Sequence, residues 1–314
     1  MVLIPVTKVK SGYKPQSFDT SIETDVLMFQ LLQRLTPRDK VIRTINFNQA
    51  VRRLAISGIE SQYKSATPGL KRQEFIKRRL GSDWINILSD SYDWGDFVIQ
   101  DPIWLARKIA DILEPLGISY VVGGSVASSL LGENRATQDL DLVINISAQQ
   151  APQLISAMSG EFYISESAVF EAIAKAESAP RESSFNVIYL PAIEKADIFV
   201  MSNDPFSVST MNRRQLHVAS AASDKGIYIY SAEDIILQKL CWYKLTGGVS
   251  QTQWRDVLGV LKVQGDRLNF NYLSQWGETL KVADSLAQAL QQSGLEYSNS
   301  PKLCIESFNT HFKK

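Results

Sequence analysis

Two short groups of residues in the middle of the chain have the types and the spacing needed to hold a phosphorylated ligand. Gly123, Gly124 and Ser125 follow one apolar segment, and Asp139 and Asp141 begin the next. Glycines let a backbone approach a ligand closely, and a serine at a helix start places its hydroxyl beside the anion-attracting N-terminus. Aspartates two positions apart on a strand project from one face. Together these groups suit a magnesium-bound nucleoside triphosphate.

The same residues also fit a plainer structure, in which a surface turn precedes a strand with two solvent-facing acids. The surrounding pattern supports the ligand site because it supplies the elements that would position it. Asp101-Pro102 opens a predicted helix that ends before Gly117, and residues 118–122 form a predicted strand that leads into the glycines. A second strand then begins with Asp-x-Asp, and Leu140 between the two aspartates would point into the core.

At these residues the chain resembles the nucleotidyltransferase superfamily that is built on the DNA polymerase β-type fold. The resemblance rests on the Gly-Gly-Ser turn followed by Asp-x-Asp, and Gly132, Arg135 and Thr137 add a similarity to AbiEii-like, toxin–antitoxin-type nucleotidyltransferases. It covers roughly residues 101–265, about half the chain. It implies an α/β (α+β) fold with a mixed sheet, flanking helices and a helical C-terminal region. The sequence adds a small all-α N-terminal domain.

The resemblance implies a third acid on a later strand, and Asp197 in the segment EKADIFV is the candidate, with Glu194 as the fallback. Asp139, Asp141 and Asp197 would then be the catalytic and metal-binding residues for two Mg²⁺ ions. Asp197 would also be a candidate general base for the acceptor hydroxyl. The alternative is a strand-end aspartate that faces water.

Further residues are expected at the nucleotide. Gly123, Gly124 and Ser125 would hold the β- and γ-phosphates, although Ser125 could be a simple helix cap. Arg135 would contact the triphosphate or the acceptor, or else pair with Glu133.

The segment SAEDIILQKLCWYKL followed by WRDVLGVL is similar to the helices after the palm of AbiEii-like proteins. There the resemblance implies a phosphate-binding role for Lys239, which could instead extend along apolar neighbours. Asp256 would orient Lys239 or lie near the metal, or else sit on a surface helix. Gln138 departs from the family pattern, in which a basic or small residue is common.

We predict a helical, basic N-terminal domain (1–82), an acidic connector (83–100), an α/β domain (101–230) and a helical C-terminal region (231–314). Residues 1–19 are expected to be a loose arm. Three helices should follow. The first opens with a Thr20–Glu23 capping box and runs to Leu35. The second follows the Thr36-Pro37 cap and ends at Gly58, with Phe47, Ala50, Val51 and Leu54 as its apolar stripe. The third lies between Thr67-Pro68 and Gly81.

The remaining elements are predicted from periodicity. The strands are residues 185–190, 196–201, 216–219 and 227–230, and the helices are residues 148–158, 231–245, 251–263, 270–282 and 283–292.

Charge is unevenly distributed although the net charge is zero. Residues 1–100 carry 15 basic and 10 acidic side chains, and residues 37–80 carry 11 basic and 3 acidic ones. Such a surface could bind a nucleic-acid backbone. It could equally dock on the segment from Asp83 to Asp101, which has five aspartates and no basic residue.

Composition excludes several classes. No apolar run reaches membrane-spanning length, and the N-terminus lacks a signal-peptide pattern. Two cysteines and two histidines give neither a disulfide framework nor a multi-histidine metal site. We therefore expect a cytoplasmic protein with no membrane partner.

The expected reaction is Mg²⁺-dependent transfer of a nucleoside monophosphate from an NTP, with ATP-binding as one expected property, to an acceptor hydroxyl. By the resemblance, the acceptor would be a tRNA 3′ end in a toxin–antitoxin-like system. The alternatives are a side chain of a cognate toxin or antitoxin protein, an antibiotic hydroxyl, or a non-catalytic antitoxin-like binding module.

Overall fold

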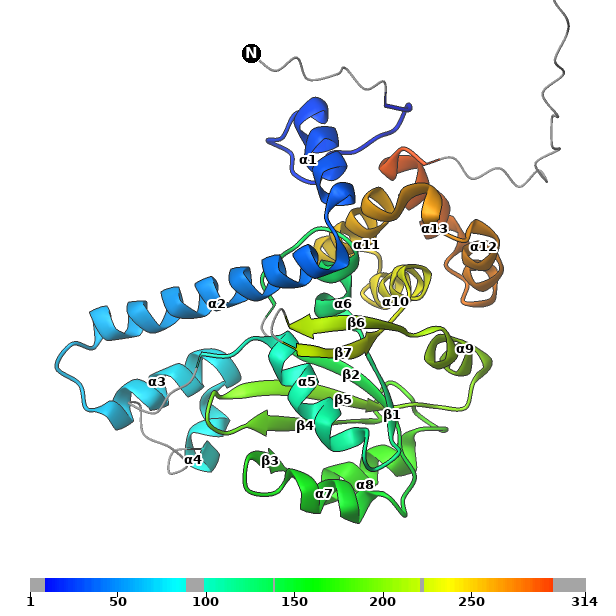
Figure 1. Cartoon of the computed structure of the whole chain (residues 1–314). Helices are drawn as coiled ribbons and strands as arrows, with labels where there is room; N and C mark the ends of the chain where they lie inside the picture. Colours follow the sequence, from blue (N-terminus) through cyan, green and yellow to red (C-terminus); the bar gives the residue numbers. More distant parts are fainter. Residues whose placement is uncertain (1–8, 89–98, 138, 221–222, 296–314) are drawn as a thin grey trace, which may run out of the picture.

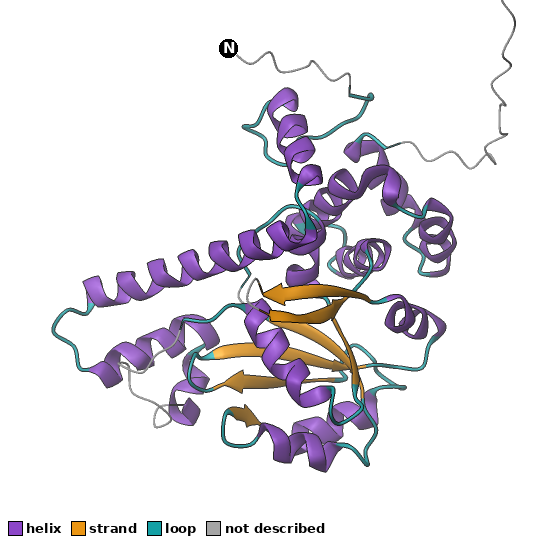
Figure 2. Cartoon of the chain, in the orientation of Figure 1, coloured by secondary structure: helices purple, strands orange, loops and turns teal. Residues whose placement is uncertain are grey.

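One mixed sheet of seven strands forms the centre of the protein, with helices around it (Figures 1 and 2). The structure is a computed structural model and describes residues 9–88, 99–137, 139–220 and 223–295. The strand order is β3-β4-β5-β2-β1-β7-β6. β1 pairs in parallel with β7 and β2 with β5, whereas the other neighbours are antiparallel. The strands are β1 (Ser119–Val122), β2 (Leu140–Asn145), β3 (Phe162–Ile164), β4 (Ser184–Tyr189), β5 (Glu194–Val200), β6 (Gln215–Ser220) and β7 (Ser223–Ile229).

The helices fall into three groups along the chain. The N-terminal group is α1 (Ile22–Arg34), α2 (Pro37–Gln62), α3 (Pro68–Leu80) and the short α4 (Ile85–Leu88). The helices within the sheet region are α5 (Pro102–Leu113), α6 (Gly124–Leu131), α7 (Ala151–Met158), α8 (Glu166–Lys175) and α9 (Pro205–Arg213). The C-terminal group is α10 (Ala232–Leu245), α11 (Gln251–Gln264), α12 (Phe270–Thr279) and α13 (Ala283–Ser293).

The predicted fold class, α/β with a mixed sheet, flanking helices and a helical C-terminal region, is confirmed. The central strands are apolar and fully buried, with Leu140, Leu142 and Ile144 of β2 at 0% exposure. Helix α5 crosses the sheet and contacts β1, β2, β5, β6 and β7. Four of the labelled helices and strands have no counterpart in the sequence prediction, namely β3, α4, α8 and α9.

Local sequence signals set most helix starts. The caps at Thr36, Thr67 and Asp101 each accept a backbone N–H and precede a proline at the first helical position. The first helix differs from prediction, because its N-cap is Ser21, which accepts from Thr24 N–H, and not Thr20.

Helix α2 differs from prediction in two ways. It continues through Gly58 to Gln62, because that glycine has no positive φ and meets no neighbour that would end the helix. The predicted apolar stripe is also wrong: Phe47, Val51 and Leu54 are 44%, 39% and 73% exposed. The buried face of α2 instead carries a polar series at four-residue spacing, Lys40, Thr44, Asn48 and Arg52.

The polarity of the surroundings explains this reversal. Arg52 donates to Glu194 at the start of β5, and Arg79 of α3 lies 2.9 Å from the same carboxylate. Beside this ionic group, Ile59, Phe75, Ile76 and Leu88 share a buried cluster with Ile188 and Ile193 of the sheet region. The basic helices therefore dock on Glu194 of β5, a carboxylate outside the Asp83–Asp101 segment that was the predicted docking surface.

Docking of these helices on the acidic connector stays a prediction. Residues 89–98 of that connector, residues 1–8 of the arm and the C-terminal residues 296–314 lie outside the described part of the chain. The domain boundaries at residues 82, 100 and 230 stay predictions. Among the described helices, none is long and apolar enough to cross a membrane.

Candidate functional site

The register between β2 and β5 brings two predicted site residues together. Asp141 pairs directly with Asp197 across these parallel strands. Residues that face each other on adjacent strands project from the same side of the sheet, so both carboxylates lie on one face about 5 Å apart at the backbone. Asp139 precedes β2 by one residue, and its side chain is 39% exposed. Sequence order alone could not give this register, because 52 residues of intervening structure separate Asp141 from β5.

Gly124 and Asp141 are in close contact. Gly124 has a φ of +54°, and a Cβ there would lie 1.7 Å from Asp141 Oδ2. Gly123 N–H donates to the carbonyl oxygen of Asp141 at 2.9 Å. The space where a side chain of residue 124 would lie is therefore filled by the Asp141 carboxylate. The effect is to hold Asp141 beside the N-terminus of α6.

Ser125 and its neighbours form a hydroxyl chain below this turn. The Ser125 hydroxyl is buried and hydrogen-bonds to Thr137 Oγ1. Thr137 Oγ1 also lies 3.0 Å from the carbonyl oxygen of Asp139. The helix cap is Gly123 and makes no side-chain cap, so Ser125 is not the N-cap residue. Through Thr137, Ser125 links the glycine turn to the loop that carries Asp139.

The inner face of α2 holds the same loop. Thr137 N–H donates to Asn48 Oδ1 at 3.0 Å, and the Asn134 carboxamide lies 2.8 Å from Thr44 Oγ1. These contacts give the buried polar residues of α2 their partners. Gln138, the departure from the family pattern, lies outside the described residues.

A cation lies among the carboxylates. Lys195 Nζ is 3.1 Å from Asp197 Oδ2 and 3.8 Å from Asp139 Oδ2. Lys195 and Asp197 are two residues apart on β5 and so share a face. Lys195, in the segment EKADIFV, is not among the predicted site residues. The spacing Lys195-x-Asp197 places the lysine on the same face of its strand as the predicted third acid, which could have identified it from the sequence.

Burial and like charge perturb this group. Burial, followed by the nearby Asp197, raises the pKa of Asp141 to about 6, and Lys239 and Lys195 oppose the rise. Burial also raises the pKa of Asp197, against the effect of Lys195. Paired acids of this kind are typical of sites that hold a cation or move a proton.

Arg135, Asp256 and Lys239 form one ion-pair network. Asp256 accepts from Arg135 Nε at 2.8 Å and from Arg135 Nη2 at 2.9 Å, and Lys239 Nζ lies 2.8 Å from Asp256 Oδ2. Burial alone would raise the pKa of Asp256, but hydrogen bonds from Arg135 and the charge of Lys239 bring it below its ordinary value. Asp256 thus orients Lys239, one of the roles predicted for it. The predicted alternative partner of Arg135, Glu133, pairs with Arg255 instead.

Glu194, the fallback third acid, is not brought to this group. It lies three residues before Asp197 on β5 and so points to the opposite face of the strand, where Arg52 and Arg79 bind it. Gly132 contributes through packing, because a Cβ there would lie 2.7 Å from Val260 N of α11.

A cavity of about 530 Å³ opens beside Asp141. Gly124 and Lys239 lie at its polar part, and apolar and aromatic side chains of β5, α9, α10 and the residues that flank them form much of the rest. These include Phe199, Met201, Phe206, Tyr230 and Trp242. A volume of this size suits a ligand of nucleoside dimensions.

The acids are not gathered into a closed metal site. In the described residues no three His, Cys, Asp or Glu side chains converge closely enough to hold a metal ion by themselves. The chemistry still fits a magnesium ion, because Mg²⁺ in phosphate sites needs one or two carboxylates and takes its other ligands from phosphate and water. The Lys195 ammonium between two carboxylates shows that the group accepts a cation.

Comparisons with known proteins give distant similarities. No protein-family model and no curated protein matches the sequence. Similar solved structures include an antigenic nucleotidyltransferase-like protein from Paracoccidioides brasiliensis, with 19% identity, a TM-score of 0.42, and coverage of 62% of this chain and 91% of that one. ANT(2″)-Ia in complex with adenylyl-2″-tobramycin has 12% identity and a TM-score of 0.39, covering 57% of this chain and 96% of that chain. JHP933 from Helicobacter pylori has 15% identity and a TM-score of 0.34, covering 61% and 79%. These likenesses are too distant to assign a function.

Proposed function

We propose that this chain is a nucleotidyltransferase that moves a nucleoside monophosphate from a magnesium-bound nucleoside triphosphate to an acceptor hydroxyl. The observation that carries the proposal is the in-register pairing of Asp141 with Asp197, beside the N-terminus of α6. Hard oxygen ligands on one side and a helix N-terminus on the other are what a metal–triphosphate complex needs.

Asp139, Asp141 and Asp197 would hold the magnesium, and two ions are expected from the number of acids. Bound magnesium would neutralise charge that develops on the transferred phosphoryl group and the leaving oxygens. The backbone amides at the start of α6 and the Lys239 ammonium bind the phosphates. Lys239 is suited to this role because Asp256 fixes its position at 2.8 Å. Asp197 accepts the proton of the attacking hydroxyl, a role that its raised pKa supports.

The cavity beside Asp141 takes the nucleoside. Its aromatic and apolar wall can bury a base and a ribose, while Gly124 and Lys239 keep the phosphates at its polar part. The wall does not by itself select one base.

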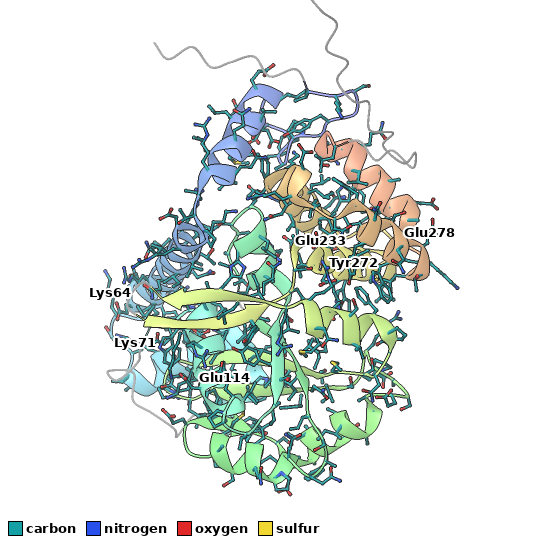
Figure 3. All side chains as sticks on the ribbon, turned by 45° about the vertical axis from the view of Figure 1, so that its right-hand side comes forward. Lys64, Lys71, Glu114, Glu233, Tyr272 and Glu278 are labelled. Carbon is teal, nitrogen blue, oxygen red and sulfur yellow. The ribbon has the colours of Figure 1, made fainter. Side chains whose placement is uncertain are left out.

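The proposed acceptor is an RNA 3′ end, such as that of a tRNA. Exposed cations on α2, α3 and the loop between them support this, namely Arg43, Arg53, Lys64 and Lys77. Lys64 and Lys71 lie on the side of the molecule opposite Tyr272 and Glu278 of α12 (Figure 3). A side chain of a partner protein in a toxin–antitoxin-like pair and an antibiotic hydroxyl are the other acceptor classes that the test must distinguish.

The test is incubation with each α-labelled triphosphate, Mg²⁺ and, in separate reactions, tRNA, cell protein or an aminoglycoside. Label in RNA supports the proposal in full, and label in protein or drug keeps the reaction but changes the acceptor. Calorimetry with triphosphate and Mg²⁺ is run in parallel. If no triphosphate binds, the chain is a non-catalytic binding module and the proposal fails.

A further inference from the structure

Lys195 is a cation placed inside the acidic group, and no role follows for it from nucleotidyl transfer as described above. Its ammonium lies 3.1 Å from Asp197 and 3.8 Å from Asp139, and its side chain is 22% exposed. The Lys195 ammonium thus forms an ion pair with each of these two acids.

The sheet fixes this position. Leu140 pairs with Ala196 across β2 and β5, so the residues that precede them, Asp139 and Lys195, enter the sheet side by side. Asp197 follows Lys195 on the same face of β5. The aliphatic part of Lys195 therefore runs along the strand, and its ammonium reaches the oxygens that a divalent ion would need.

The other cation near this group has a different partner. Lys239 acts on Asp141 through space, but its ammonium is bound to Asp256 on α11. The two lysines therefore differ in their partners. Lys239 is paired with Asp256, whereas Lys195 is paired with the predicted metal ligands Asp139 and Asp197.

We propose that Lys195 is a positioning residue that serves as the internal counter-cation of the metal site, holding Asp139 and Asp197 in the metal-free protein and competing with the divalent ion for the same oxygens. This inference rests on the proposed function, because it requires that these acids bind a metal. When the ion binds, the Lys195 ammonium leaves the carboxylates and becomes accessible.

The first experiment measures metal affinity. Mn²⁺ binding is followed by electron paramagnetic resonance, and Mg²⁺ by its displacement of Mn²⁺, in the full chain without nucleotide. Lys195→Met removes the competitor, so the dissociation constant should fall by about three- to tenfold, the range expected for one or two partly exposed ion pairs. Lys195→Arg keeps the charge and should stay near wild type.

Two control variants separate competition from a general change of charge. Lys239→Met removes a charge near Asp141 that contacts no metal-binding oxygen, and it should change the affinity less than Lys195→Met does. Lys175→Met removes a surface lysine that pairs with Glu171 on α8, and it should have no effect. An equal increase in Mn²⁺ affinity in Lys195→Met and Lys239→Met would overturn the proposal that Lys195 competes with the metal ion.

The second experiment reads the position of the amine directly. Wild-type protein is acetylated with a limiting amount of an amine-reactive ester at increasing Mg²⁺, and Lys195 modification is measured by mass spectrometry. Modification of Lys195 should rise with the same midpoint as metal binding, while that of Lys175 stays constant. Constant or decreasing modification of Lys195 would overturn the proposal, because the ammonium would then remain on the acids.

The outcomes separate this inference from the proposed function. If wild type transfers nucleotides but Lys195→Met binds Mn²⁺ no more tightly, Lys195 is a structural ion pair and the transferase assignment stands. If wild type binds neither Mn²⁺ nor a triphosphate, both proposals fail together.

Discussion

The carboxylate of Asp141 occupies the space that a side chain at residue 124 would need, since a Cβ on Gly124 would lie 1.7 Å from Asp141 Oδ2. The helix start that binds phosphates and the acid that binds metal therefore depend on each other for their positions.

Gly124→Ala should abolish nucleotidyl transfer. The new methyl group displaces Asp141, and the φ of +54° adds a backbone cost of about 1–2 kcal/mol. Gly117→Ala is the matched control, because Gly117 also has a positive φ, +66°, but a Cβ there meets nothing within 4 Å. Gly117→Ala should lose stability through the same backbone cost and should keep its transfer activity. If Gly124→Ala retains transfer as Gly117→Ala does, the close contact between residue 124 and Asp141 is not needed for activity.

Asp141→Asn should abolish transfer and yet stabilise the metal-free protein above pH 6. The pKa of Asp141 is about 6 in the folded state and near its ordinary value of 3.8 when unfolded. Between these values the unfolded state loses its proton first, so the contribution of Asp141 to stability falls as pH rises through this window and stays low above it. Melting temperatures in chelator should show a gain for the variant at pH 7 and little difference at pH 3.5. An exposed acid, Asp266→Asn, supplies the control.

Lys239→Ala should weaken triphosphate binding more than it weakens folding, and Asp256→Asn should do the same because it releases Lys239. A double-mutant cycle on triphosphate affinity should give a coupling of about 0.5–3 kcal/mol. Lys244→Ala, which removes an exposed lysine from the same helix, is the control. A lower melting temperature with unchanged nucleotide affinity would make Lys239 a structural residue.

Glu194→Gln should destabilise the protein by about 3–5 kcal/mol, because it removes the buried carboxylate that pairs with the guanidiniums of Arg52 and Arg79. Urea unfolding measures the loss. Glu171→Gln, in a surface pair with Lys175, should change stability by well under about 1 kcal/mol. A small effect of Glu194→Gln would mean that the helices dock mainly through their apolar cluster.

If α2, α3 and the loop between them bind RNA, they do so through Arg53, Lys64 and Lys77, which are exposed. Replacing these three with Glu should weaken tRNA binding and reduce the slope of log affinity against log salt. Arg79 is unsuitable for this test because it is bound to Glu194. A gel shift at several salt concentrations decides the matter, and absence of binding at low salt removes the nucleic-acid role.

The sequence predicted the sheet region well, because its local signals agree with its tertiary environment. Asp101 caps α5, Leu140 is buried between the two aspartates, and Asp256 meets Lys239. The failures lie where burial depends on a distant partner. Phe47 and Leu54 were predicted to face the core, yet α2 turns Asn48 and Arg52 inward. Hydrophobic periodicity cannot detect a polar face that is buried against Thr137 and Glu194.

That inward polar face of α2 has a consequence for the order in which the chain can fold. During synthesis α2 is made long before its partners, because Thr137 follows Asn48 by 89 residues and Glu194 follows Arg52 by 142. Until β5 has left the ribosome, the Arg52 guanidinium lacks the Glu194 carboxylate that it binds in the folded protein. The first eighty residues therefore reach their final packing late, after a long loop has closed. A shortened chain that ends before β5 should leave α2 exposed to proteases even though α2 itself is complete.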